Sequence, residues 1–197
     1  MTTTTTHPAL VDALWTKNNT LLRNVLLAVA GSIALWISAK IQIPFYPVPV
    51  SMQTLVVLLI GMAFGWKLGG ATVALYLMEG LAGLPVFAGT PEKGIGLAYM
   101  VGPTGGYLLG FLIAAVVVGW LAERGFDRSI ILTAIAMLVG SILIYIPGVI
   151  WLGSVVGWDK PVLQWGMIPF LYGDALKLAI AALLMPTVWK LIAPKAK

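Results

Sequence analysis

The sequence contains no cysteine and only one histidine, and these two absences exclude several kinds of chemistry. Without cysteine, the chain has no disulfide framework, no thiolate metal site and no thiol nucleophile. The single histidine, His7, lies in a threonine-rich N-terminal segment, so it cannot complete a Ser-His-Asp set or a metal cluster. We therefore expect no resident metal ion, no cofactor and no enzymatic activity.

A phosphate-binding loop of the Walker A type is also missing, because nowhere does Gly-Lys-Ser/Thr follow a glycine at the required spacing. The chain therefore cannot act by itself as a P-loop ATPase. Any ATP-driven process in which it takes part must use other subunits.

Charged residues are scarce: they make up 10% of the chain, whereas 60% is hydrophobic and the mean hydropathy is +0.98. A soluble domain of this length cannot bury so much apolar surface, so the sequence indicates an integral membrane protein. The net charge of +5 is better explained by lysines and arginines that set membrane topology than by nucleic-acid binding.

Six apolar stretches are long enough to cross a bilayer, and they predict an all-α bundle of six transmembrane helices. We expect polar tails over residues 1–22 and 193–197, with the membrane domain between them over 23–192. The N-terminal tail lacks the order of a cleaved signal peptide, so the first apolar stretch is predicted to be retained. The predicted helices cover residues 23–41, 50–64, 68–84, 104–122, 130–152 and 167–191.

The distribution of basic residues predicts the orientation of this bundle. With six helices both termini lie on one side, together with the second and fourth loops. That side carries eight lysines and arginines, whereas the other side carries only Lys40, Lys93 and Lys160. The positive-inside rule therefore places both termini in the cytoplasm and the first, third and fifth loops outside.

Two ionisable residues, Asp174 and Lys177, lie inside the last apolar stretch. Charges at membrane depth are costly and tend to persist where they have a role, and residues three apart share one face of a helix. The pair predicts either a polar site for a small ligand near the outer surface or an internal ion pair that only holds helices together.

Other polar and aromatic residues are expected near the same outer side and could meet in one pocket. For Glu79 and Lys93 the alternative is a charge in an exposed loop, and for the aromatic residues it is an interfacial belt. This candidate set is Gln53, Glu79, Phe87, Lys93, Tyr107, Trp151 and Tyr172.

Four ordered segments resemble the BioY family, the biotin-specific membrane subunits of energy-coupling-factor (ECF) transporters. The segments are PVPVSMQTL at 47–55, GLPVFAG at 83–89, GPTGGYLLGF at 102–111 and PFLYGDALK at 169–177. The resemblance implies six helices, biotin bound near the outer face, and the first and third loops closing over it. It also implies a complex with a transmembrane coupling protein and two ATPases, although some members are thought to work without it.

The family pattern Gly-Asp-x-x-Lys carries over to Gly173, Asp174 and Lys177. Lys93, in a more polar third loop than the family pattern, is the candidate partner for the biotin carboxylate. Glu79 stands where a neutral residue is expected. The ureido ring of biotin would face Asp174 and Lys177, and the aromatic residues would line its apolar parts.

Two alternatives remain open at this point. One is a stand-alone biotin permease, acting as a homo-oligomer without ATPases. The other is a membrane enzyme or helical scaffold, in which the Asp174–Lys177 pair is only structural. Under both alternatives the chain is embedded in membrane lipid.

Overall fold

The computed structural model describes residues 7–15, 20–44 and 46–192, and over these residues the chain is mostly helical. Five described helices are long and apolar enough to cross a membrane, which makes the chain a multi-pass membrane protein. These helices are α2 (Thr20–Lys40), α3 (Gln53–Leu81), α5 (Gly105–Ala122), α6 (Ile130–Val156) and α8 (Ile168–Ile192).

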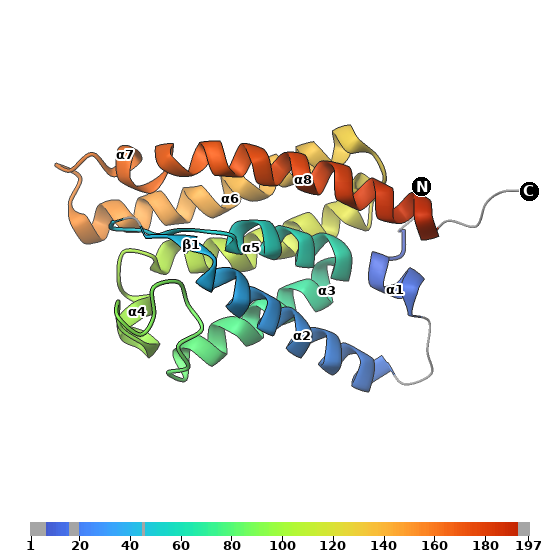
Figure 1. The fold of residues 1–197 in the computed structure, drawn as a ribbon, viewed down its shortest axis with the longest axis horizontal. Helices are drawn as coiled ribbons and strands as arrows, with labels where there is room; N and C mark the ends of the chain where they lie inside the picture. The colour runs from blue at the N-terminus through green and yellow to red at the C-terminus, as the bar shows by residue number, and fades with distance from the viewer. Residues whose placement is uncertain (1–6, 16–19, 45, 193–197) are drawn as a thin grey trace, which may run out of the picture.

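The second and third predicted spans, 50–64 and 68–84, correspond to the two parts of α3, which is interrupted at Gly65 and covers 53–81. Gly65 has φ 77° and ψ 175°, a left-handed backbone that glycine adopts without a Cβ clash. A Cβ added at Gly69 would lie 3.0 Å from the Cα of Gly61, so the chain after Gly65 returns along the segment before it. Figure 1 shows the two parts of α3 diverging from this turn.

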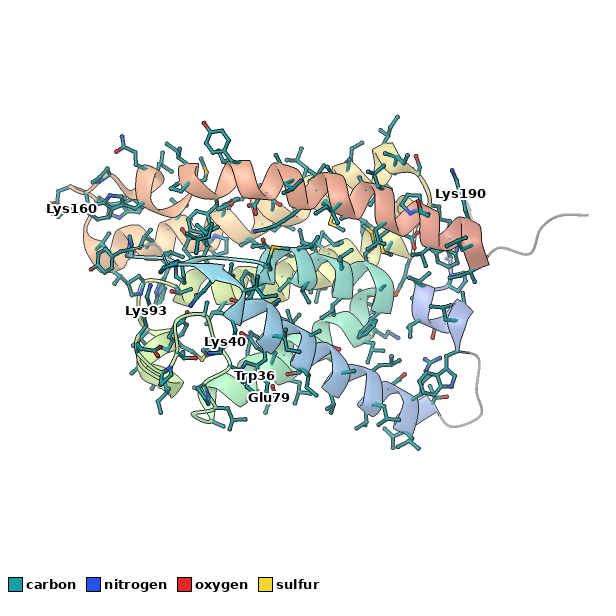
Figure 2. The ribbon with its side chains drawn as sticks, in the orientation of Figure 1. Trp36, Lys40, Glu79, Lys93, Lys160 and Lys190 are labelled. Atoms are coloured by element: carbon teal, nitrogen blue, oxygen red, sulfur yellow. The ribbon has the colours of Figure 1, made fainter. Side chains whose placement is uncertain are left out.

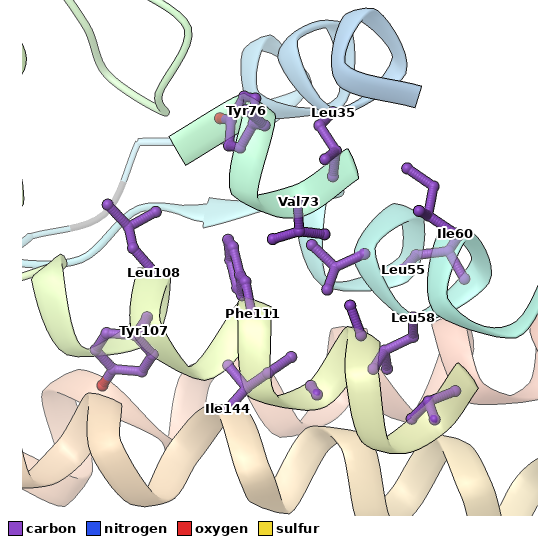
Figure 3. Close-up of a cluster of buried hydrophobic side chains, with 14 of the residues drawn as sticks. Leu35, Leu55, Leu58, Ile60, Val73, Tyr76, Tyr107, Leu108, Phe111 and Ile144 are labelled. Carbon is purple, nitrogen blue, oxygen red and sulfur yellow. The ribbon is translucent and has the colours of Figure 1, made fainter. Parts of the chain in front are cut away.

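The long helices pack in sequence order around α5, which contacts both α3 and α6, while α2 packs on α3 and α8 on α6. Small residues allow these close approaches, because a Cβ at Gly61 would meet the Ala115 backbone and one at Gly110 would meet Ile144. Figure 3 shows the resulting core between α3, α5 and α6, where Val73, Phe111 and Ile144 meet.

Short elements gather at the two ends of the bundle (Figure 1). At one end, here called the ribbon end, lie β1 (Gln42–Ile43) paired antiparallel with β2 (Val50–Ser51), α4 (Gly96–Met100) and α7 (Val162–Gly166). At the other end, the α1 end, lie α1 (Leu10–Leu14), the turn at Gly65 and the 3₁₀ helix η1 (Phe126–Arg128). The end of α8 lies beside α1.

The described structure differs from the sequence prediction at the N-terminus. The predicted polar tail over 1–22 contains α1, whose Leu10 and Val11 are buried, and α2 begins at Thr20 rather than at 23. Apolar burial explains the difference, because α1 packs against α3 and α8. The predicted tail over 193–197 lies outside the described residues.

Candidate functional site

The polar pair of α8 lies on one face of that helix and forms an ion pair. Lys177 Nζ lies 3.0 Å from Asp174 Oδ1, and the two side chains are only 9% and 11% exposed. Removing charges from water is costly unless each finds a charged or hydrogen-bonding partner. The surroundings of both groups therefore determine what the pair can do.

All three ammonium donors of Lys177 have an acceptor. Besides Asp174, Lys177 Nζ donates to the backbone oxygen of Ser51 and to Thr54 Oγ1, both at 2.8 Å. Ser51 belongs to β2, and Thr54 lies in the first turn of α3. Lys177 thus connects α8 to the first loop and to the start of α3.

Asp174 accepts hydrogen bonds at both carboxylate oxygens. Thr54 Oγ1 lies 3.3 Å from Oδ1, and the Tyr145 hydroxyl of α6 donates to Oδ2. The Tyr145 ring packs edge-on against Tyr107 and Phe170, whose rings stack on each other. A charged cluster therefore lies directly beside an aromatic one, which is the mixture that small-ligand sites use.

A small internal cavity of about 30 Å³ joins these two clusters. It is large enough for a water molecule but far below the several hundred Å³ of a vitamin-sized site. Its wall comes from the first loop, the third loop and four long helices. The lining residues are Val48, Pro49, Ser51, Gln53, Thr54, Ala88, Thr104, Tyr107, Phe111, Ile144, Tyr145 and Phe170.

A larger groove of about 570 Å³ runs between α6 and α8. Its walls include Ile142, Ile146 and Leu171, which are about half exposed and face away from the bundle. Asp174 and Tyr145 reach its inner side, but the other lining groups are almost all apolar. We place the candidate site at the internal cavity, because several polar residues line it, whereas the groove is almost entirely apolar. Two of these polar residues, Thr54 and Tyr145, are hydrogen-bonded to Asp174 and join the cavity to the Asp174–Lys177 pair.

Gln53 belongs to the wall of the internal cavity and is buried. Its Nε2 donates to the Tyr76 hydroxyl at 2.6 Å, and that hydroxyl donates to the Val86 backbone oxygen at 2.8 Å. The chain of bonds connects the start of α3 to the third loop. Gln53 and Tyr107, two of the predicted residues, are therefore brought together with the Asp174 cluster.

Two lysines fasten the third loop over this region. Lys40 Nζ donates to the backbone oxygens of Phe87 and Thr90, at 3.1 and 3.0 Å. Lys93, in the third loop, reaches the first loop: its Nζ lies 3.5 Å from the Pro47 backbone oxygen. Partial burial lowers the pKa of the Lys93 ammonium. A carboxylate beside Lys93 would stabilise its charged form.

Of the nine predicted residues, Gln53 and Tyr107 line the cavity, and Asp174 and Lys177 lie beside it, bonded to Thr54 of its wall. Lys93 reaches from the third loop toward the first loop and is not in the wall.

The other four predicted residues are placed elsewhere. Tyr172 is 84% exposed, because it precedes Asp174 by two residues and so faces the opposite side of α8. Trp151 is 39% exposed and donates to the Gly102 backbone oxygen at 2.9 Å. The carboxylate of Glu79 accepts from Ser32 of α2, and Phe87 packs between Tyr76 and Tyr99.

Four residues of the cluster were not among the predicted site residues: Ser51, Thr54, Tyr145 and Phe170. Ser51 and Thr54 lie in the 47–55 segment and Phe170 in the 169–177 segment, so the motifs already contained them. Tyr145 is a polar tip within an otherwise apolar stretch, and the sequence already indicates it as a polar group that could reach the pocket, although it was not in the candidate set.

Comparisons with known proteins agree on one family. A model described as the BioY family matches residues 6–194. The biotin transporter BioY of Thermotoga maritima is 37% identical over 170 residues, covering 86% of this chain and 98% of the relative. A probable biotin transporter BioY of Pyrococcus horikoshii is 36% identical over 148 residues, covering 75% and 85%.

A solved structure is similar over nearly the same length. It is the crystal structure of the S-component for biotin from an ECF-type ABC transporter. It matches with a TM-score of 0.73 and 26% sequence identity, covering 88% of this chain and 94% of the solved chain.

Proposed function

Because the chain belongs to the BioY family, we propose that it binds biotin and serves biotin uptake as the substrate-specific subunit of an ECF-type transporter. The observation that carries this proposal is the buried Asp174–Lys177 pair, with Thr54 and Tyr145 converging on it beside an aromatic wall. A merely structural pair needs no cavity and no aromatic lining.

The chemistry of biotin matches this cluster. The ureido ring offers two N–H donors and one carbonyl acceptor. Asp174 can accept from the N–H groups, and Lys177 can donate to the carbonyl. Tyr107 and Phe170 provide apolar walls for the thioether ring, and Gln53 adds a further polar group. A ligand that lacks a ureido group would leave buried polar atoms unpaired, which is costly.

The first and third loops have to open for biotin to enter, because the internal cavity holds only about 30 Å³. Lys93 lies 3.5 Å from the Pro47 oxygen of the first loop, and its ammonium is partly desolvated. We assign to Lys93 the role of partner for the biotin carboxylate. That contact would hold the third loop over the bound ligand.

We infer six membrane passes, two of them from α3, with both termini in the cytoplasm. The return of the chain at Gly65 supports the count, and the basic-residue distribution supports the orientation. Cysteines introduced by Glu92→Cys and Arg128→Cys test this orientation, because both positions are exposed to a labelling reagent. Position 128 is preferred to its neighbour Asp127, which is buried. A membrane-impermeant reagent should label position 92 from outside and 128 only from inside; the reverse pattern overturns the orientation.

Coupling subunits are proposed to dock on α2. This helix is the least covered of the five, with 17% of its apolar stretch buried, against 28% or more in the others. Ala30 and Ala34 are exposed one turn apart on it, so a partner helix could approach closely. Ala30→Leu/Ala34→Leu should impair complex formation and leave biotin binding intact. Loss of binding would show instead that these alanines are needed inside the subunit.

The experiment that tests the proposed function is a biotin titration of the purified chain without ATP. Saturable binding is expected, and its absence in folded protein would overturn the proposal in favour of a structural scaffold. Uptake in a host without coupling subunits separates a subunit from a stand-alone permease. No uptake there supports the subunit, and uptake supports the permease.

A further inference from the structure

A further hollow lies at the α1 end, on the outside of the bundle and away from the Asp174 cluster. It is an apolar groove of about 530 Å³, lined by Trp66, Val116, Val117 and Trp120. We call it the tryptophan groove. Trp66 directly follows the turn at Gly65, and Trp120 lies in the last turn of α5. Both tryptophans therefore lie where membrane-spanning segments end, the depth that tryptophan favours.

Backbone contact between the two helices sets the shape of this groove. A Cβ at Gly119 would lie 2.5 Å from the Trp66 backbone nitrogen, so α5 and the turn touch directly. The Trp66 N–H also donates to Glu123 Oε1 at 3.2 Å. With the backbones this close, the indole rings project outward, and both are at least 40% exposed.

A cation accompanies each indole ring. The Arg124 guanidinium lies 3.3 Å from the Trp120 ring centroid, and Lys67 Nζ lies 5.3 Å from that of Trp66. Arg124 uses one N–H for the Trp120 backbone oxygen, at 3.1 Å, and a guanidinium has five such donors. Both cations are exposed. The nearby acid, Glu123, accepts from the Trp66 N–H.

We propose that the tryptophan groove binds an anionic phospholipid, with an acyl chain along the valines and the phosphate held by Lys67 and Arg124. The apolar lining at an intramembrane depth selects a hydrocarbon chain, and the two cations at its end select a negative headgroup. A free phosphate would use the cations but not the groove. This site is separate from the proposed biotin site and does not depend on it.

Native mass spectrometry of delipidated protein tests the proposal with phosphatidylglycerol and phosphatidylcholine added at equal concentration. The wild-type chain should prefer phosphatidylglycerol by about tenfold, and Lys67→Gln/Arg124→Gln should abolish the preference. Arg128→Gln/Lys190→Gln is the matched control, because it removes two exposed cations from the same end outside the groove. Circular dichroism and thermal unfolding check that each variant is folded.

A third variant tests the apolar half of the site. Val117→Phe fills the groove without changing charge and should weaken phosphatidylglycerol binding severalfold, whereas glycerol phosphate should not compete with the lipid. Equal binding of the two lipids by the wild type overturns the proposal. So does an equal loss in the control double variant, which would indicate general attraction to a basic surface. Undiminished binding in Val117→Phe would reduce the site to a phosphate contact and overturn its lipid assignment.

Discussion

Two buried aspartates illustrate how differently the two ends of this bundle use the same side chain. Asp174, toward the ribbon end, accepts hydrogen bonds at both oxygens from Thr54, Tyr145 and Lys177. Asp127, at the α1 end, accepts from Trp189 Nε1 at Oδ2, while its buried Oδ1 has no hydrogen-bond partner among the described residues.

The difference lies in what the partners can do. The partners of Asp174 are side chains beside a cavity, and a ligand with matching donors could replace them. Asp127 is 1% exposed beneath Trp189, and its Oδ1 has only a long ion pair, of 3.9 Å, with Arg128 Nε. Burial raises the pKa of the Asp127 carboxyl above its usual 3.8. The Asp174 carboxylate is thus suited to exchange its partners for a ligand, whereas the Asp127 carboxylate is enclosed by packing and has a structural role.

The largest expected effect is a loss of biotin affinity when Asp174 or its partner is replaced, but not when Asp127 is replaced. Asp174→Asn and Lys177→Met should each weaken biotin binding by about 30-fold to several thousandfold, because losing one partner of a buried charged hydrogen bond costs about 2–5 kcal/mol. Asp127→Asn should leave affinity unchanged. Biotin titration and thermal unfolding, measured side by side on folded protein, provide the comparison.

A structural role for the Asp174 pair predicts the opposite pattern. If Asp174→Asn and Lys177→Met both lower the melting temperature and keep near-normal biotin affinity, Asp174 has the same structural role as Asp127. The proposed site would then be wrong, although the fold would stand.

The next effect concerns the cation proposed for the ligand carboxylate. Lys93→Gln should weaken biotin binding about tenfold and should change the binding of biotin methyl ester little, because the ester has no charge to pair. Lys160→Gln is a suitable control, since Lys160 is an exposed lysine at the same end, paired with exposed Asp159. Figure 2 shows both lysines at the ribbon end, opposite Lys190. Equal losses for biotin and its ester would argue against the assignment.

A smaller effect is expected from removing one hydroxyl. Tyr145→Phe keeps the ring and deletes the hydrogen bond to Asp174, so biotin affinity should fall about fivefold, the equivalent of about 1 kcal/mol. Trp189→Phe makes the corresponding deletion at Asp127 and should lower the melting temperature without altering affinity. Isothermal titration and thermal unfolding of both variants measure the contrast; a loss of affinity in Trp189→Phe would contradict it.

The smallest effect is a pH dependence. Since the pKa of Asp127 is raised in the folded state, the folded chain holds its proton to higher pH than the unfolded chain. This group's contribution to stability is present below pH 3.8 and is lost as pH rises through the folded-state pKa. Asp127→Asn should flatten this decline in melting temperature as the pH rises above 3.8. Asp159→Asn, an exposed acid, should leave the profile unchanged.

The sequence predicts the long helices well because membrane-spanning segments carry a strong hydropathy signal. The first residues of α5, α6 and α8 lie within one position of those predicted. Short elements such as α4 and the β ribbon were missed, because their conformation depends on packing against other parts of the chain. The turn at Gly65 was predicted from the stretch Gly65-Trp66-Lys67, and the non-helical backbone of Gly65 confirms it.

The candidate site was predictable only in part. The spacing of Asp174 and Lys177 fixes their shared helix face, so their pairing follows from local geometry. Their contacts with Ser51 and Thr54 join segments more than 100 residues apart, which periodicity cannot reveal. Tyr172 and Trp151 were expected at the site because the predicted topology places both near the outer side and their rings suit an apolar wall. Tyr172 faces the opposite side of α8, and Trp151 donates to the Gly102 backbone oxygen instead.

The three donors of Lys177 have a consequence for how binding and movement are connected. An ammonium group has only three N–H bonds, and here they hold Ser51, Thr54 and Asp174. Any acceptor that an incoming molecule presents to Lys177 must displace one of these partners. If the Ser51 oxygen is displaced, the tether between α8 and the first loop is cut by the same event that recognises the cargo. The cargo and the first loop would then compete for one nitrogen atom, so a weak bond to the loop would favour tight capture.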